Sequence, residues 1–468
     1  MSLVRLRAHA EWRPLALTAA ATVTLTALML ASPALWNGYP LAYYDSVDYV
    51  LMPFNWDMPI YRTGAYGVFA GIGRLGHSLW AVVLLQSLIV AYVLYEACRR
   101  FAPEASLRAL VLLTAALALL SGLPWVTSQI IPDAFTGAVV LGALVLAFPD
   151  GSLSMPRQIA LMCVLAVAGA CHSSHLALQG GIILCLLAVR FLASKGWPLL
   201  APKLRASVLV LAAAIGLATG SNWLMTGRAF LVQPSAALTL GLLVQDGLAK
   251  RYLDEVCRSP GLYKPRLCMA RNRLPPTAND FLWHDADFWR LGGWTGSADE
   301  ARRIVFGCLH DFPLSYAWTS LKLTFQQLGM VETGDGLTPM EFFIGHAIRG
   351  YYAPEVPPFS HAEQQAGIDF TLINEIQVPV QLAGFVALFP LIWLAYRRRD
   401  KTSTTLLALV LLALIGNAFV CGALSNPNDR YQSRIEWLAL AAAGLGAVRL
   451  LRPTRDARGS ARTRPEDV

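Results

Sequence analysis

Charged side chains lie in a stretch where an otherwise apolar chain would be expected to avoid them. Residues 36–67, WNGYPLAYYDSVDYVLMPFNWDMPIYRTGAYG, separate two long apolar segments and carry Asp45, Asp48 and Arg62. Ionisable residues at membrane depth are costly, so they are candidates for function. If this stretch is helical, Asp45 and Asp48 share one face. Two close carboxylates can supply a general base or hold a divalent cation such as Mg²⁺ or Mn²⁺, and the alternative is two solvated loop acids.

A second group of charged residues lies near the other end of the chain, in SNPNDRYQSRIEW. Arg430 and Arg434 are four residues apart at the start of the last apolar segment. Guanidinium groups match the geometry of phosphate oxygens, and Arg62 offers a third group of the same kind. We therefore predict phosphate binding by these three arginines. In the simpler alternative, Arg434 pairs with Asp429 or Glu436 and anchors the segment.

Three further polar residues lie where apolar helices are expected to begin. Asp133 follows Pro132 in PWVTSQIIPDAF, where an aspartate can either cap a helix or act as a second functional acid. His172 and His175, in HSSH, are three residues apart on one helical face. They could form an accessory site, or they could satisfy the backbone of a tight turn between two apolar segments. No cysteine or histidine spacing suggests a zinc site.

The composition indicates the elements that must hold these residues. Of 468 residues, 55% are hydrophobic and 15% are charged, whereas about a quarter of a soluble domain is charged. A membrane span needs roughly 17 to 25 mainly apolar residues, and about ten segments are candidates. These segments are 15–35, 78–98, 107–126, 134–149, 159–171, 176–193, 207–225, 379–396, 404–424 and 435–451. The sequence therefore predicts an all-α polytopic membrane protein. The first segment is interpreted as an anchor rather than a cleaved signal peptide because its apolar run is long.

Lysine and arginine favour the cytoplasmic side of a membrane, and here they flank alternate ends of the predicted spans. The residues concerned are Arg5, Arg7, Arg13, Arg99, Arg100, Arg108, Arg157, Lys195, Lys203, Arg205, Arg397, Arg398, Arg399, Lys401, Arg449, Arg452 and Arg455. With ten spans they all fall on one side. We therefore expect both termini to be cytoplasmic in a bacterial inner membrane, with loops 36–77 and 226–378 periplasmic. The net charge of +8 then reflects topology, and no nucleic-acid partner is expected.

Three units are predicted along the chain. Residues 1–225 form a membrane module with seven spans and the catalytic loop 36–77, residues 226–378 form a mainly helical periplasmic domain, and residues 379–468 contain the last three spans and a cytoplasmic tail. If the outer side is oxidising, Cys257 and Cys268 can form a disulfide. A third cysteine in the same domain, Cys308, leaves the pairing open.

This layout resembles the GT-C superfamily of membrane glycosyltransferases. The likeness covers roughly residues 1–378 and consists of an aspartate shortly after the first span, a second acid between the third and fourth spans, and a large outer loop between the seventh and eighth. DRYQSR before the last span is also similar to bacterial members. DSVD differs from a strict DxD motif.

The resemblance implies transfer of a sugar from a polyprenyl-phosphate donor to a lipid, glycan or protein acceptor. It implies that Asp45 or Asp48 is the base and that Asp133 is a secondary acid. The implied reaction is a direct displacement at the anomeric carbon, with inversion, and the three arginines would stabilise the departing lipid phosphate. No nucleotide-binding motif is required, and the sequence contains no Gly-rich phosphate loop.

Three rival interpretations remain open at this point. A polymerase or ligase of lipid-linked saccharides would also carry arginines in outer loops, but it would not depend on the aspartates of the first loop. A multispan transporter would be expected to show inverted repeats and charged or broken spans at mid-bilayer. A membrane acyltransferase that uses His172 would lose activity in His172→Ala and tolerate Asp45→Asn.

Overall fold

The computed structural model describes residues 17–148, 153–232, 235–259 and 264–451. Within these residues the chain is helical without strands, and the only β-type contact is an isolated bridge between Leu41 and Gln129. The predicted all-α class is therefore confirmed. Arg5, Arg7 and Arg13 and the polar tail 452–468, which the topology prediction uses, lie outside the described residues.

Among the described residues, six helices are long and apolar enough to cross a membrane, which indicates a multi-pass membrane protein. They are α5 (Trp80–Phe101), the stretch Pro103–Leu120 formed by η1 (Pro103–Ala105) and α6 (Ser106–Leu120), α10 (Ser173–Ser194), α11 (Arg205–Thr226), α21 (Thr371–Arg397) and α22 (Lys401–Leu424). They coincide with the predicted second, third, sixth, seventh, eighth and ninth spans.

Helices also occupy the other four predicted spans, but they are shorter or carry charge. They are the helix Leu17–Leu30, α8 (Thr136–Ala147), α9 (Met155–Ala170) and α23 (Asp429–Leu450). α23 contains Arg430, Arg434 and Glu436 among its buried residues, which lowers its hydropathy. The full number of spans therefore remains a prediction.

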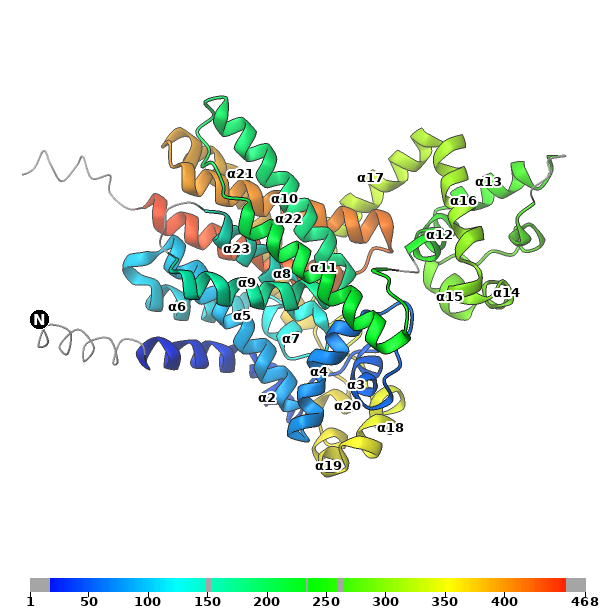
Figure 1. Cartoon of the computed structure of the whole chain (residues 1–468), viewed down its shortest axis with the longest axis horizontal. Helices are drawn as coiled ribbons and strands as arrows, with labels where there is room; N and C mark the ends of the chain where they lie inside the picture. Colours follow the sequence, from blue (N-terminus) through cyan, green and yellow to red (C-terminus); the bar gives the residue numbers. More distant parts are fainter. Residues whose placement is uncertain (1–16, 149–152, 233–234, 260–263, 452–468) are drawn as a thin grey trace, which may run out of the picture.

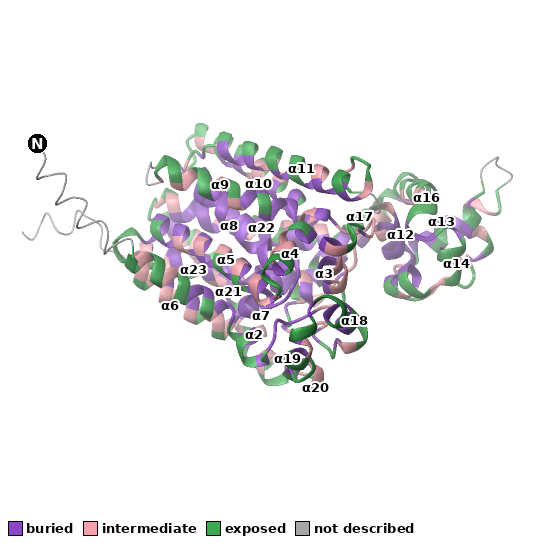
Figure 2. Ribbon diagram, turned by 60° about the horizontal axis from the view of Figure 1, so that its bottom comes forward, coloured by how far each residue is buried: buried purple, intermediate pink, exposed green. Residues whose placement is uncertain are grey.

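The core of the bundle forms around α8, which is apolar on every side and buried along its whole length. α5, α9, α10 and α23 pack around it, and Figure 2 shows it as a buried element inside the bundle. Close approach depends on small residues: a Cβ atom added to Gly137 would lie 2.4 Å from the ring of Trp437. Trp437 itself is among the largest fully buried side chains.

The segment between the first two predicted spans folds into short helices. These helices are α2 (Ser32–Asn37), α3 (Ser46–Asn55) and α4 (Gly64–Gly76). Residues 41–46 run beside residues 128–130, because Leu41 N–H donates to the Ser128 carbonyl at 2.9 Å and the Ser46 hydroxyl donates to the Ile130 carbonyl at 3.0 Å. This contact brings the start of α3 next to the segment that connects α7 (Leu123–Thr127) with η2 (Pro132–Phe135) and α8.

The segment predicted as one periplasmic domain, 226–378, is divided between two hydrophobic cores. Its first part forms a lobe, which we define as residues 235–312, with its own core that includes Phe281, Phe288 and Ile304. The lobe contains α12 (Ser235–Gln245), α13 (Leu248–Val256), η3 (Arg266–Met269), η4 (Asp280–His284), α14 (Ala286–Arg290), α15 (Gly293–Gly296) and α16 (Ala298–Asp311). Figure 1 shows the lobe beside the bundle, joined to it by α17 (Pro313–Gly329). Cys257 and Cys268 form a disulfide within the lobe.

The second part of this segment packs against the loop 36–77. It contains α18 (Glu341–Tyr351), η5 (Ala353–Glu355), α19 (Val356–Ser360) and α20 (Glu363–Ala366). The Tyr39 hydroxyl donates to Glu355 at 2.6 Å, and Gln364 bonds both the N–H and the carbonyl of Ala42, at 3.0 and 2.6 Å. These contacts make α18–α20 a cover for the loop. In Figure 1 the helices α18–α20 lie at the bottom of the view, below the bundle.

We expect Gly137→Ala to destabilise the fold by about 1–3 kcal/mol, because a well-packed core has no room for an added methyl group. The added atom would overlap the buried Trp437 ring. Thermal unfolding of the detergent-solubilised protein measures this as a lower Tm. Gly180→Ala, in α10, is the matched control because no atom lies within 4 Å of its added Cβ. Equal Tm values for Gly137→Ala and wild type would contradict this packing.

Candidate functional site

The two aspartates of the first loop lie at the start of α3, where the sequence predicts them to share a face. Asp45 precedes the helix and Asp48 lies in its first turn. Both bind the same guanidinium: Arg62 Nη2 is 2.5 Å from Asp45 Oδ1, and Arg62 Nε is 2.9 Å from Asp48 Oδ2. The acids therefore face one cation that comes from their own loop.

Asp45 also reaches the last helix of the bundle. Arg430 Nη2 lies 3.0 Å from Asp45 Oδ2, although the two residues are 385 positions apart in the sequence. An acid of the loop 36–77 and an arginine of α23 are thus in direct contact. Asp45 has one arginine on each of its two carboxylate oxygens.

Asp133 holds the two arginines of α23 together. Arg430 Nε and Arg434 Nη1 each lie 2.5 Å from one of its oxygens, and Asp133 and Arg434 have no solvent exposure. Asp133 lies in the first turn of η2, but it makes no side-chain cap hydrogen bond to η2 or to α8, so its carboxylate serves the two arginines. The alternative in which Arg434 pairs with Asp429 or Glu436 is wrong, because Arg434 binds Asp133 instead.

These contacts form a continuous ion-pair chain, which we define as Asp48, Arg62, Asp45, Arg430, Asp133 and Arg434. Three carboxylates alternate with three guanidinium groups, so the chain has no net charge. Exposure falls along it from 21% at the Asp48 side chain to 0% at Arg434. A buried charge is tolerated only when it is paired, so the buried end at Asp133 and Arg434 depends on complete pairing. At the exposed end, near Asp48, solvent is present and the charged groups can exchange partners.

Asp48 is the most exposed carboxylate of the ion-pair chain. Its Oδ1 has no hydrogen-bond partner among the described residues, whereas both oxygens of Asp45 and of Asp133 are bound. Burial raises the pKa of the Asp48 carboxyl above its usual value, and the Arg62 charge only partly opposes this. A carboxylate with a free oxygen and a raised pKa is suited to accept a proton.

Aromatic rings cover the guanidinium groups. Arg430 Cζ lies 4.1 Å from the centre of the Tyr43 ring, and Arg62 Cζ lies 5.0 Å from that of Tyr61. Burial raises the pKa of Tyr43 to about 12, so its phenol stays neutral beside the cation. Such contacts fix the planes of the guanidinium groups without neutralising them.

A narrow cleft opens on Arg430. It is lined by Gly122, Trp125, Val126, Gln129, Ile131, Thr333, Gly334, Asp335, Arg430 and Ser433. Asp335 Oδ2 accepts the backbone N–H of Arg430 at 3.3 Å. Gly334 and Gly336 have φ values of +95° and +72°, a conformation that side chains disfavour, and this lets residues 333–336 turn tightly beside the site.

Sequence reasoning missed this turn and missed Tyr43, Trp125 and Asp335. The sequence TGDG, a glycine-rich break between two apolar helices, was the available sign of a tight turn. Asp335 of this turn and Arg430 are 95 residues apart in the sequence, and no local pattern indicated that they would be in contact.

The two histidines have structural contacts. Both ring nitrogens of His175 are bound, to the Thr136 hydroxyl at 2.9 Å and to the Ala168 carbonyl at 2.8 Å. His172 caps α10 by accepting the N–H of Ser174 at 3.1 Å, and the Ser174 hydroxyl lies 3.2 Å from Arg434 Nη2. His172 therefore reaches the inner end of the ion-pair chain through Ser174, whereas both ring nitrogens of His175 are used in structural contacts.

A divalent cation does not fit between Asp45 and Asp48 as they stand. The Arg62 guanidinium occupies the position that a cation bound by both carboxylates would need. Across the residues with described positions, no group of three or more His, Cys, Asp or Glu side chains could hold a metal ion. We therefore assign no step to a metal.

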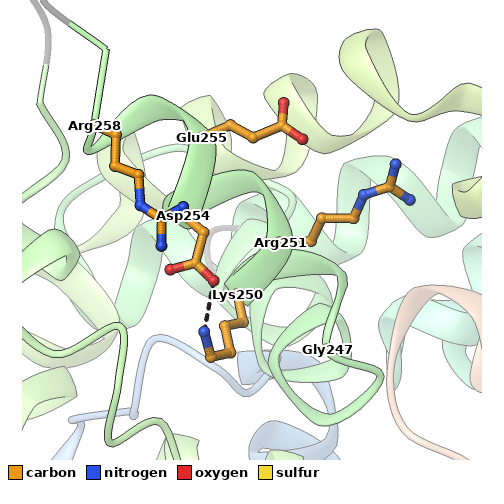
Figure 3. A pocket seen from close by; sticks show the side chains of 6 residues that line it. All are labelled: Gly247, Lys250, Arg251, Asp254, Glu255 and Arg258. Atoms are coloured by element: carbon orange, nitrogen blue, oxygen red, sulfur yellow. Dashed lines mark hydrogen bonds and ion pairs between the residues drawn. The ribbon is translucent and has the colours of Figure 1, made fainter.

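A larger concavity lies elsewhere, on the lobe. This open groove of about 520 Å³ is lined by Gly247, Lys250, Arg251, Asp254, Glu255 and Arg258. Figure 3 shows Lys250 facing Asp254 within α13, and their charged atoms are 2.6 Å apart. The groove contains no member of the ion-pair chain. Its Lys250 and Asp254 already pair with each other at an exposed surface, where such contacts contribute little.

Comparisons with protein-family models, with curated proteins and with solved structures found no match to this chain.

We expect Asp133→Asn to lower the free energy of unfolding by about 3–5 kcal/mol, because it leaves the buried Arg434 without a counter-charge and Arg430 with Asp45 alone. Chemical or thermal unfolding in detergent measures this loss. Asp48→Asn is the matched control: Arg62 keeps Asp45 as a partner, so the expected loss is below about 1 kcal/mol. Equal losses in the two variants would contradict the difference in burial between the two ends of the ion-pair chain.

Proposed function

We propose that this chain is a membrane glycosyltransferase of the GT-C type, which moves a sugar from a polyprenyl-phosphate donor to a lipid, glycan or protein acceptor. In the proposed topology, about ten helices cross a bacterial inner membrane and both termini are cytoplasmic. The exposed end of the ion-pair chain faces the periplasm, where a lipid-borne donor and a water-soluble or lipid acceptor can meet.

The observation that supports this proposal most strongly is the contact of Asp45 with Arg430 at 3.0 Å. Inverting sugar transfer from a lipid phosphate needs a carboxylate base and a cationic site for the leaving phosphate within one pocket. The first outer loop supplies two acids and the last helix supplies the cation. Both acids and Arg430 retain some exposure, so substrate can reach them.

The contacts support different roles for the arginines. Arg430 lines the cleft, and Arg62 lies at the exposed end, so both can exchange a carboxylate for a phosphate oxygen. Arg434 is fully buried and its nitrogens contact Asp133, Ser174 and Cys421. We therefore assign Arg434 and Asp133 as positioning residues, which hold Arg430 in place and do not touch substrate.

The proposed step balances without a cofactor. The acceptor hydroxyl gives its proton to the carboxylate of Asp45 or Asp48, and its oxygen forms a bond to the anomeric carbon. The bond from that carbon to the phosphate oxygen breaks on the opposite face, and its electron pair leaves with the polyprenyl phosphate. Arg430 and Arg62 stabilise the charge of that phosphate, which needs no proton to depart.

We expect Asp45→Asn and Arg430→Ala to reduce sugar transfer on the order of 100-fold or more, because each removes a group that acts on the charge formed in the transition state. The assay measures transfer from polyprenyl-phosphate sugars by membranes with matched protein levels. Asp254→Asn, on the exposed groove of the lobe, is the control and should transfer like wild type. Full transfer by both site variants would reject the assigned roles. A wild-type protein that transfers no sugar but dissipates a solute gradient would favour a transporter.

The pH profile separates the two candidate bases. A base works only when deprotonated, so transfer should fall as the pH drops through its pKa. If Asp48 is the base, the acid limb should lie above the usual aspartate value of about 3.9, since burial raises the pKa of Asp48. Asp48→Asn should then lose transfer at every pH. An Asp48→Asn protein that keeps both its rate and the wild-type acid limb would assign the base to Asp45.

A further inference from the structure

The helix α17 presents a row of large apolar side chains that nothing in the described chain covers. Leu314, Trp318, Leu321 and Phe325 are 85, 67, 48 and 66% exposed, and their spacing places them on one face of the helix. The opposite face, with Leu323 and other residues, is buried. Monomeric soluble proteins rarely expose a contiguous apolar stripe of this kind.

α17 packs more extensively against the membrane-spanning helix α22 than against any other element. A Cβ atom added to Gly422 of α22 would lie 2.6 Å from the Leu323 carbonyl, so the two backbones are in close contact. Gln327 exchanges two hydrogen bonds with the backbone of Asn428, at 2.8 and 3.0 Å. The buried face of α17 thus lies on the end of α22 that leads into the ion-pair chain.

A third face of α17 holds the lobe. The Thr319 hydroxyl donates to Asp246 at 2.5 Å, and Lys322 lies 3.4 Å from the other oxygen of the same carboxylate. α17 therefore has one face on a spanning helix, one on the lobe and one, the apolar stripe, on neither. Figure 1 shows it between these two parts of the molecule.

We propose that the stripe lies among the acyl chains of the bilayer, so that α17 is a membrane-interface helix that anchors the lobe. The spanning helix α22, on which α17 lies, exposes its own apolar residues Leu412 and Phe419. A surface that continues from a spanning helix meets lipid, not water. α17 also carries Lys322, Gln326 and Gln327 and holds the lobe on another face, so it meets lipid only along the stripe and lies in the interface without crossing.

Anchoring by α17 does not require sugar transfer. The sequence predicts that residues 226–378 lie outside the membrane, whereas here one helix of that segment enters the lipid. Trp318 suits this position, since tryptophan favours the boundary between headgroups and acyl chains.

The test is site-specific photo-crosslinking of the full chain in phosphatidylcholine nanodiscs. p-Benzoylphenylalanine replaces Leu321 on the stripe, Phe419 on α22 as the lipid-facing control, and Glu255 on the lobe as the exposed control. We expect lipid adducts, detected by intact mass, at 321 and 419 and none at 255. Adducts at 419 without adducts at 321 would overturn the proposal, and so would a crosslink from 321 to a second copy of the chain.

A second measurement needs no added crosslinker. Lipids with brominated acyl chains quench tryptophan that contacts them, so the difference in fluorescence between wild type and Trp318→Phe isolates Trp318. We expect brominated lipid to quench that difference signal by at least half. A difference signal that is equal in brominated and ordinary lipid places Trp318 outside the acyl region and rejects the proposal.

Discussion

The pairing of Asp133 with two arginines is the constraint on which the arrangement of this molecule depends. A carboxylate without solvent exposure needs counter-charge, and Arg430 and Arg434 supply it from α23. Since both guanidinium groups converge on one residue, the start of α23 must lie against the segment that precedes α8. Arg430 then has a nitrogen left for Asp45. The buried group of Asp133, Arg430 and Arg434 in this way fixes where the loop 36–77 can meet the last helix.

The neutral ion-pair chain also limits what a ligand must do to bind. A phosphate that approaches Arg430 or Arg62 finds these cations already occupied by Asp45. Binding is therefore an exchange of anions, in which a released carboxylate becomes free to accept a proton. Such an exchange is feasible at the partly exposed end of the ion-pair chain. It is unfavourable at Asp133, because a charged group that lost its partner there would not be solvated by water. In the proposed reaction, donor binding would itself free the base.

The sequence predicted the features that depend on local pattern. Long apolar runs gave α5, α10, α11, α21 and α22, because hydropathy over a span needs no partner to be recognised. The candidate residues Asp45 and Arg430 were found because charge is rare in such a chain. Features decided by distant contacts were not predictable: Asp133 could as well have capped a helix by its position after Pro132, and the residues 333–336 have no local sign that they border Arg430. The division of 226–378 between two cores likewise depends on which apolar faces find partners in three dimensions.

The lobe is joined to the ion-pair chain through an aromatic contact. Tyr61 packs against both Trp283 and Trp294 of the lobe, with ring centres 5.4 and 5.3 Å away, and the next residue is Arg62. Tyr61 thus packs against the core of the lobe and also belongs to the loop that carries the site. Since the guanidinium of Arg62 is held by two carboxylates and a tyrosine ring, a displacement of the lobe must either move Arg62 or be absorbed in the few residues before it. Anchoring the lobe at α17 restricts that displacement, so the position of Arg62 depends on how the lobe is held as well as on its own ion pairs.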